Sequence, residues 1–332
     1  MKPERIDDRS RRWMSIAGSV VALSVWLSSP AHSAPSVNCS PDNSVTFICG
    51  VTNVEDFAPV PGTKWVIGSD LSTANCPQGY LYLFDTSKKT GSAVQPSEIA
   101  IRQDKKTYPD CPGPFDVKTF GPHGLDLTPA NGAHRVLYAV NHGGREAVEV
   151  FSVDVSQARL RFTWTGCVVA PTGFWPDAVA ALPHGAMVVT SLWDPTDPDR
   201  QKKLSAGQPV GALDEWAPGK GWSVVAGTEG MSGPNGVVVS PDGNDIYLAL
   251  WSGKQVARIN RSTTPPKVDT VSTGILTDNV RWSPSEKSIF VGGQDVTVKQ
   301  ALDCFESSAA NCDVPFRVSS YRADRIGIFP AR

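Results

Sequence analysis

Residues 121–151 read GPHGLDLTPANGAHRVLYAVNHGGREAVEVF and hold three of the five histidines in this 332-residue chain. Short apolar runs on either side of the turn residues predict a β-hairpin. His123 opens its first strand and His142 closes its second, so antiparallel pairing brings the two imidazoles to one end. A lone histidine in a strand is most often structural, but two adjacent imidazoles can orient each other and act as a general base.

Similar units recur along the chain, each with a polar turn, an apolar strand, a second turn and further strands. They start near Asp56, His123, Asp177, Asn235 and Asn279. The spacing is irregular but of the size of one four-stranded blade. Helical periodicity is scarce, so the sequence predicts an all-β fold. A β-propeller is favoured because closing a ring removes strand edges, with a sandwich or a two-barrel protein as the alternative.

Residues that are unusual for a β-protein, most of them polar, precede the inner strand of every unit. They are Glu55-Asp56, His123, Pro176-Asp177, Asn235 and Asp278-Asn279. Inner strands begin near the central tunnel of a propeller, so these side chains are expected to converge there from separate blades. Carboxylate and amide oxygens suit Ca²⁺ better than zinc or copper. Each residue alone is more often a turn former before a strand, and only the repetition favours a metal site.

Residues 121–151 resemble the paraoxonase/arylesterase family in the PHG motif, the strand after it, and the VNH motif that precedes a VE-F strand. The segments VEDFAPVPGTKWVIGSD, PDAVAALP, GPNGVVVSPDGNDIYLA and TDNVRWSP are similar to family segments in the same order, from about Asn53 to Asp295. PNG and SPDG are shared with the wider gluconolactonase and strictosidine-synthase-like superfamily. The resemblance implies a six-bladed β-propeller with two calcium ions in its tunnel, which hydrolyses lactones and aryl esters.

Carried over residue by residue, the resemblance implies a catalytic Ca²⁺ held by Glu55, Asn235, Asp278 and Asn279. A structural Ca²⁺ is implied at Asp56, Asp177 and the backbone carbonyl of Leu125. His123 is then the general base and His142 its partner. Pro176 stands where the family has an asparagine ligand, so the catalytic ion would lose one oxygen, gain a water or bind more weakly.

Two segments depart from the family pattern. No closing hairpin is evident in VPFRVSSYRADRIGIFPAR, so ring closure is expected to use the N-terminal strand SVTFICG or a short last blade. The polar residues 194–216 replace an apolar helix-bearing insertion, and we interpret them as a lid over the cavity or a solvated excursion. Their polarity argues against a lipoprotein or membrane docking surface.

Residues 1–34 are identified as an export signal from a basic start, the apolar run IAGSVVALSVWL and a small-residue site at 31–34. SRRWM loosely resembles a twin-arginine consensus, so general secretion and twin-arginine export both stay open. Residues 35–332 are expected to form one periplasmic or secreted propeller domain without a further membrane span. Removing the signal takes away five basic and three acidic side chains and changes the formal charge from -2 to -4, with no basic patch for nucleic acid.

All seven cysteines follow the signal, which suits an oxidising compartment, and their odd number leaves at least one unpaired. The simplest pairing joins neighbours along the chain: Cys39 with Cys49, Cys76 with Cys111, and Cys304 with Cys312. Cys167, in the apolar run FTWTGCVVA, is then the predicted free cysteine.

The predicted activity is calcium-dependent hydrolysis of a small-molecule lactone or aryl ester, with water activated by the histidine pair. The chain has no G-x-S-x-G elbow, H-E-x-x-H site, P-loop or G-x-G-x-x-G loop. One alternative is a sugar lactonase of the gluconolactonase kind, which does not need the histidine pair. The other is a non-catalytic periplasmic propeller that binds a ligand or partner over the tunnel mouth.

Overall fold

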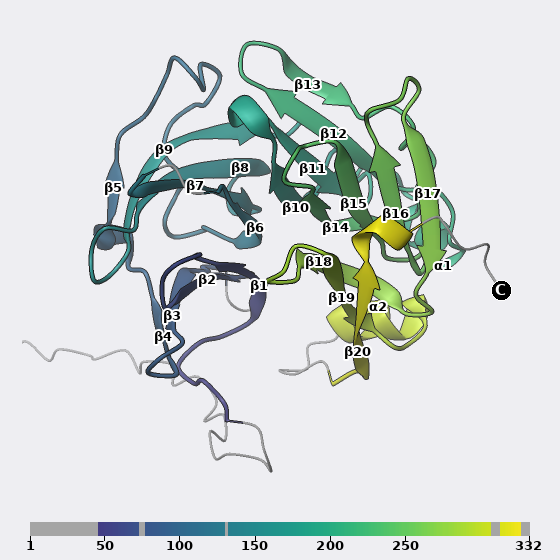
Figure 1. Ribbon diagram of the computed structural model, residues 1–332, viewed down its shortest axis with the longest axis horizontal. Coiled ribbons are helices and arrows are strands. Elements are labelled where there is room, and N and C mark those ends of the chain that lie inside the picture. Colours follow the sequence, from purple (N-terminus) through teal and green to yellow (C-terminus); the bar gives the residue numbers. More distant parts are fainter. Residues whose placement is uncertain (1–45, 73–76, 130–131, 307–312, 327–332) are drawn as a thin grey trace, which may run out of the picture.

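The structure is a computed structural model that describes residues 46–72, 77–129, 132–306 and 313–326, so the expected export signal lies outside it (Figure 1). In this part of the chain the strands form five sheets arranged around a centre. Figure 1 places the first strand of each main unit, β1, β6, β10, β14 and β18, nearest that centre. The all-β propeller prediction is therefore confirmed.

Each blade is an antiparallel sheet in which strands follow one another outward. The first is β1 (Val54–Pro59), β2 (Trp65–Asp70), β3 (Leu81–Asp85) and β4 (Thr90–Ala93). The second is β6 (Pro122–Leu127), β7 (His134–Asn141), β8 (Ala147–Asp154) and β9 (Arg161–Val169), with β5 (Ile99–Ile101) added in parallel beyond β9. A short 3-10 helix, η1 (Pro96–Glu98), precedes β5.

The remaining blades repeat this order. The third is β10 (Pro176–Ala181), β11 (Met187–Ser191), β12 (Ala212–Ala217) and β13 (Gly221–Val224), with the 3-10 turn η2 (Pro183–Gly185) between its first two strands. The fourth is β14 (Pro234–Val239), β15 (Asp245–Leu250), β16 (Gln255–Asn260) and β17 (Lys267–Ser272). The fifth has three strands, β18 (Leu276–Trp282), β19 (Ser288–Gln294) and β20 (Phe316–Arg322), followed by η3 (Ala323–Arg325).

The expected count of six blades is wrong, because the described residues form five sheets. The five units visible in the sequence each became one blade, and the described chain after β20 adds only η3. Residues 46–50, the described part of SVTFICG, form no strand, so the short last blade is the alternative that holds. The first and last blades meet through side chains: Asn279 Nδ2 donates to Glu55 Oε1 at 2.9 Å.

Two glycines let neighbouring inner strands run close together. A Cβ atom on Gly124 in β6 would lie 2.4 Å from the carbonyl oxygen of Asp177 in β10. A Cβ atom on Gly236 in β14 would lie 2.6 Å from the carbonyl oxygen of Asp278 in β18. Any larger residue would push these strands apart, which explains the glycines of the PHG and PNG motifs.

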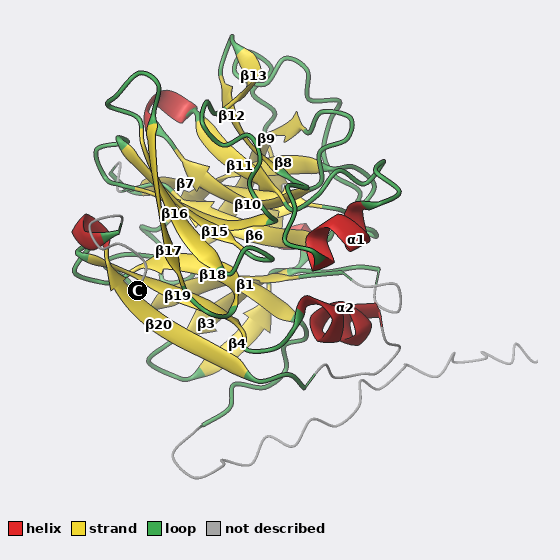
Figure 2. Cartoon of the chain, turned by 90° about the vertical axis from the view of Figure 1, so that its right-hand side faces the viewer, coloured by secondary structure: helices red, strands yellow, loops and turns green. Residues whose placement is uncertain are grey.

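Two short helices lie on the same side of the blades, α1 (Arg200–Ser205) and α2 (Val298–Glu306) (Figure 2). α1 belongs to the polar segment 194–216, but residues 212–216 of that segment are part of β12, so the excursion is shorter than predicted. Leu204 of α1 is buried in an apolar cluster with Trp251, Val298 and Ala301. The excursion is therefore anchored against α2. None of the described helices combines the length and the hydrophobicity that a membrane span requires.

A disulfide joins Cys111 to Cys167 with their Cα atoms 5.2 Å apart. Two predictions are therefore wrong: Cys167 is not free, and Cys111 does not pair with Cys76. Because β5 pairs in parallel with β9, the loop that follows β5 continues alongside β9. In this loop Asp104 N donates a 2.7 Å hydrogen bond to Thr165 O of β9. Cys49 and Cys304 are also disulfide-bonded. Their predicted partners, Cys39 and Cys312, lie outside the described residues, as does Cys76.

Replacing Cys167 with alanine is expected to lower the free energy of unfolding by about 2–4 kcal/mol, the usual effect of losing a long-range disulfide. The bond spans 56 residues and so restricts a large part of the unfolded second blade. Urea denaturation of the purified protein measures the loss. The double variant with Cys111→Ala should be no less stable than the single one, because both remove the same bond. A single variant as stable as the wild type would contradict the prediction.

Candidate functional site

All five innermost strands carry the same irregularity just after they begin. In each, two consecutive residues stand opposite a single residue of the next strand: 55–56, 123–124, 177–178, 235–236 and 278–279. A bulge of this kind bends the strand and re-aims its side chains. Seven of the eight predicted side-chain site residues are bulge residues, and the eighth, His142, directly follows β7. The repeat therefore places Glu55, Asp56, His123, Asp177, Asn235, Asp278 and Asn279 at the same end of the tunnel.

The two predicted histidines lie side by side at that end. His123 Nδ1 is 2.9 Å from His142 Nε2, and both side chains are largely buried. His142 Nδ1 is 2.6 Å from Glu146 Oε2. The indole of Trp175 stacks on the His142 ring with centroids 4.4 Å apart. Glu146 and Trp175 were not predicted, and they fix the position and orientation of His142.

These contacts set the proton positions when both rings are neutral. The ionised carboxylate of Glu146 only accepts hydrogen bonds, so His142 carries its proton on Nδ1 and accepts at Nε2. His123 then donates from Nδ1 to His142, which leaves the lone pair of His123 Nε2 pointing away from its partner. His123 Nε2 lies 3.5 Å from Glu55 Oε2. The free nitrogen therefore faces the carboxylate and amide residues of the tunnel.

The four predicted ligands of the catalytic Ca²⁺ lie near one another in the tunnel. Asn279 donates to Glu55, and Gln294 donates to the carboxylate of Asp278. Gln294, which was not predicted, is itself held by a 2.8 Å hydrogen bond from Trp251 Nε1. Burial is the largest influence on the pKa of Asp278 and raises it to about 6. Asn235, which is buried beside Asp278, lowers that pKa.

The charges around His123 are unbalanced. Burial by itself lowers the pKa of His123, but the carboxylates of Glu55, Asp177 and Asp278 outweigh it and raise the pKa to about 10. Burial raises the pKa of Asp177 to about 8, with Glu55 and Asp278 adding to the effect. Three carboxylates thus surround one imidazole. The group has an excess of negative charge that a bound cation would balance.

Two buried oxygens in this group have no hydrogen-bond partner among the described residues, Glu55 Oε2 and Asn235 Oδ1. Leaving such atoms unpaired is unfavourable, and both are predicted metal ligands. Clusters of three or more His, Cys, Asp or Glu with metal-site geometry do not occur in the described chain, so a metal ion here would need amide oxygens as well. Carboxylate and amide oxygens are ligands that Ca²⁺ accepts. Pro176 is buried at the start of β10 and contributes no side-chain oxygen.

The predicted structural Ca²⁺ site, which lies deeper in the tunnel, is arranged differently. Asp56 Oδ2 accepts a 2.7 Å hydrogen bond from the Leu125 N–H. The guanidinium of Arg281, a residue that was not predicted, donates to Asp56 and to the Leu125 carbonyl oxygen at 3.1 Å. Two of the three predicted groups of the structural Ca²⁺ site therefore already contact a cationic side chain. These residues do not fit a metal ion in the arrangement described.

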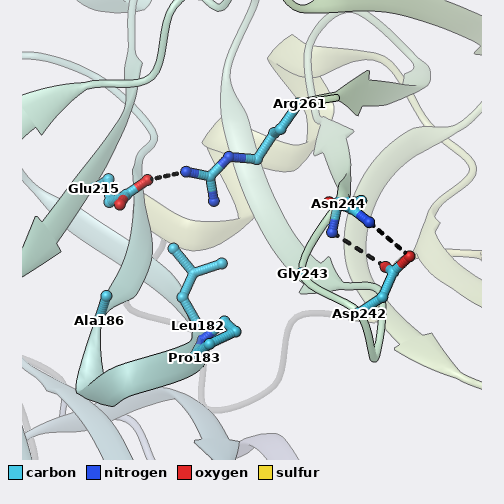
Figure 3. A pocket seen from close by; sticks show the side chains of 8 residues that line it. All are labelled: Leu182, Pro183, Ala186, Glu215, Asp242, Gly243, Asn244 and Arg261. Carbon is cyan, nitrogen blue, oxygen red and sulfur yellow. Dashed lines mark hydrogen bonds and ion pairs between the residues drawn. The ribbon is translucent and has the colours of Figure 1, made fainter. Parts of the chain in front are cut away.

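A pocket of about 350 Å³ lies at the opposite end of the inner strands (Figure 3). Leu182 and Pro183 line it, and they follow the last residue of β10, whereas the histidine pair lies by its first. The charged groups that Figure 3 shows there already have partners: Glu215 pairs with Arg261, and Asp242 accepts hydrogen bonds from the backbone and side chain of Asn244. The bulge end of the tunnel is therefore the candidate active site.

No family model matches the chain, and no curated protein matches it. Several solved structures are similar in shape. A putative oxidoreductase (glucose dehydrogenase) from Thermus thermophilus is 12% identical over 82% of this chain and 98% of that one, with a TM-score of 0.39. Hydrazine synthase from Kuenenia stuttgartiensis is 12% identical over 80% and 82% of the two chains, with a TM-score of 0.44. A protein from Lactobacillus plantarum is 14% identical over 74% and 65%, with a TM-score of 0.45. None of these similarities assigns a function.

Proposed function

We propose that this protein is a calcium-dependent hydrolase of lactones or aryl esters, of the paraoxonase/arylesterase kind. The observation that carries the proposal is the line of contacts from Glu146 through His142 and His123 to Glu55, which ends beside unpaired ligand oxygens. A buried histidine held by a second histidine and a carboxylate is an arrangement that suits general base catalysis. The sugar lactonase alternative does not use this pair.

Glu55, Asn235, Asp278 and Asn279 would hold the catalytic Ca²⁺. When bound, this ion supplies positive charge for the oxygen on which negative charge develops. It would also balance the carboxylates that otherwise keep His123 protonated.

His123 performs the proton transfers in this proposal. Its Nε2 accepts a proton from water as the water oxygen forms a bond to the carbonyl carbon of the ester. The C–O bond to the leaving alcohol or phenol oxygen then breaks, and His123 returns the proton to that oxygen. His142 and Glu146 hold the His123 ring in place and stabilise its positive charge between the two transfers. The products are a carboxylic acid and an alcohol, joined in one molecule when the substrate is a lactone.

We also propose that the protein works outside the cytoplasm. The Cys111–Cys167 disulfide supports an oxidising compartment. This agrees with the export signal expected at residues 1–34.

The test is the initial rate of proton release on a panel of aliphatic, acyl-homoserine and aromatic lactones and of aryl esters. Rates are measured on the untreated protein, after chelation, and after Ca²⁺ is restored. We expect turnover of at least one class, its loss on chelation, and its recovery with Ca²⁺. Undiminished turnover after complete removal of metal would contradict the role of calcium. No turnover of any substrate by the folded, calcium-loaded protein would favour a binding propeller instead.

A further inference from the structure

Arg281 extends from β18 of the last blade to the inner strands of the first two blades. Its Nη2 donates to Asp56 of β1 and to the carbonyl oxygen of Leu125 in β6, the latter at 3.1 Å. Its Nε is 3.3 Å from the carbonyl oxygen of Phe57, also in β1. Its Nη1 donates back to Val280 O at 2.9 Å. One guanidinium therefore connects three inner strands within the tunnel.

Arg281 supplies the positive charge beside the buried carboxylate of Asp56. Asp56 is almost completely buried, and Arg281 is the cation that its carboxylate contacts. Asp126 and Glu55 also lie close enough to raise the pKa of Arg281, against the effect of burial, which is the largest influence and lowers it. Because a guanidinium does not lose its proton in proteins, the positive charge is permanent. A divalent ion that shared Asp56 and Leu125 with it would be strongly repelled.

The position of Arg281 also accounts for ring closure. Inner strands of successive blades lie directly against each other, β1 against β6, β6 against β10, β10 against β14 and β14 against β18. Between β18 and β1 the ring is bridged by side chains, with Asn279 on Glu55 and Arg281 on Asp56 and Phe57. A side chain thus spans the junction at which a five-bladed ring must close.

We infer that the Arg281 guanidinium replaces the deeper, structural cation, so that the tunnel binds one divalent ion at most and the ring closes without a second. The inference rests on the proposed function only for the ion at Glu55, Asn235, Asp278 and Asn279. The deeper position needs no ion because the arginine already neutralises Asp56 and occupies the Leu125 carbonyl.

The experiment counts calcium ions per chain after equilibrium dialysis, by elemental analysis, and follows the melting temperature with and without calcium. Wild type is expected to bind one ion. Arg281→Ala frees the carboxylate of Asp56 and the carbonyl of Leu125, and Asp177 lies near Asp56, so the variant is expected to bind one ion more than wild type. The melting temperature of the variant should then depend on calcium more strongly than that of wild type. If Arg281→Ala does not fold, Arg281→Gln supplies the same comparison with a neutral side chain of similar length.

Arg258→Ala is the matched control. Arg258 pairs with Asp245 at 2.8 Å, between β16 and β15, and its side chain is about as exposed as that of Arg281, so its loss should leave the ion count unchanged. Two ions in wild type, or no additional ion in the Arg281 variants, would overturn the inference. No ion in wild type together with one in Arg281→Ala would uphold it and would instead contradict the calcium site of the proposed function.

Discussion

Replacing His123 with asparagine is expected to reduce ester or lactone hydrolysis on the order of 100- to 10,000-fold, the usual contribution of a general base. The imidazole Nε2 is the atom that faces the tunnel ligands, and asparagine has no group with comparable basicity. Asparagine keeps a polar side chain beside His142, so the fold should survive. The loss should appear in kcat, measured by proton release with saturating substrate and saturating Ca²⁺.

His134→Asn is the control for this variant. His134 lies on β7, the strand that ends directly before His142, but it is exposed to solvent. His134 makes no contact with the tunnel, so the His134→Asn variant should be as active as wild type. The His123 variant should also retain its bound calcium, because the proposed ligands are oxygens of other residues. Full activity in His123→Asn would remove the base assignment, whereas loss of calcium from the variant would show that His123 acts on the ion instead.

The positions of the blades were readable from the sequence because each unit begins with a local signal. Proline followed by the bulge pair marks the start of β6, β10 and β14, and glycine is required where two inner strands nearly touch. Such signals depend on a few adjacent residues. The resemblance added a sixth blade that those signals did not contain, and the described chain has five.

The candidate site was predictable to the same extent, because all its predicted side chains except His142 belong to bulge residues. The residues that orient them lie elsewhere in each blade and carry no repeat signal. Glu146 reaches His142 through a turn with Gly144 at a positive φ of 75°, and Gln294 reaches Asp278 from the end of β19. Such contacts follow from how the strands and turns are placed in space, so spacing along the chain does not indicate them.

Arg281 shows why the blade number matters for the site. In a six-bladed ring another inner strand would separate β18 from β1, and Arg281 would not meet Asp56. With five sheets the two strands are neighbours, and the guanidinium reaches the carboxylate. The Cys111–Cys167 bond has a similar origin, because β5 pairs with β9 from a distant part of the chain. The Arg281–Asp56 contact and the Cys111–Cys167 bond therefore both depend on how distant parts of the chain are placed in space, and local sequence patterns do not indicate them.

Glu149 is the buried charge on which the second blade depends. Its side chain is completely buried on β8 and accepts hydrogen bonds from three neighbours: Arg145, Trp164 and Asn141. Asn141 in turn accepts hydrogen bonds from the backbone of Gly121 and Gly143 at 3.0 and 2.8 Å. These two glycines flank the histidine pair in the sequence. Glu149 therefore supports both the blade and the turn that positions His142.

Glu149→Ala is expected to lower the free energy of unfolding by about 3–5 kcal/mol, because it leaves Arg145 as a largely buried charge without its carboxylate and removes a partner from two further donors. Urea denaturation monitored by tryptophan fluorescence gives the value. Asp303→Ala is the matched control, since Asp303 pairs with Lys299 at 2.6 Å with both side chains more than half exposed, and its loss should change stability by about 1 kcal/mol or less. Equal stabilities for the two variants would mean that the Glu149 network does not stabilise the blade. A loss confined to Glu149→Ala would confirm that the buried hydrogen bonds and ion pair of Glu149 stabilise the second blade.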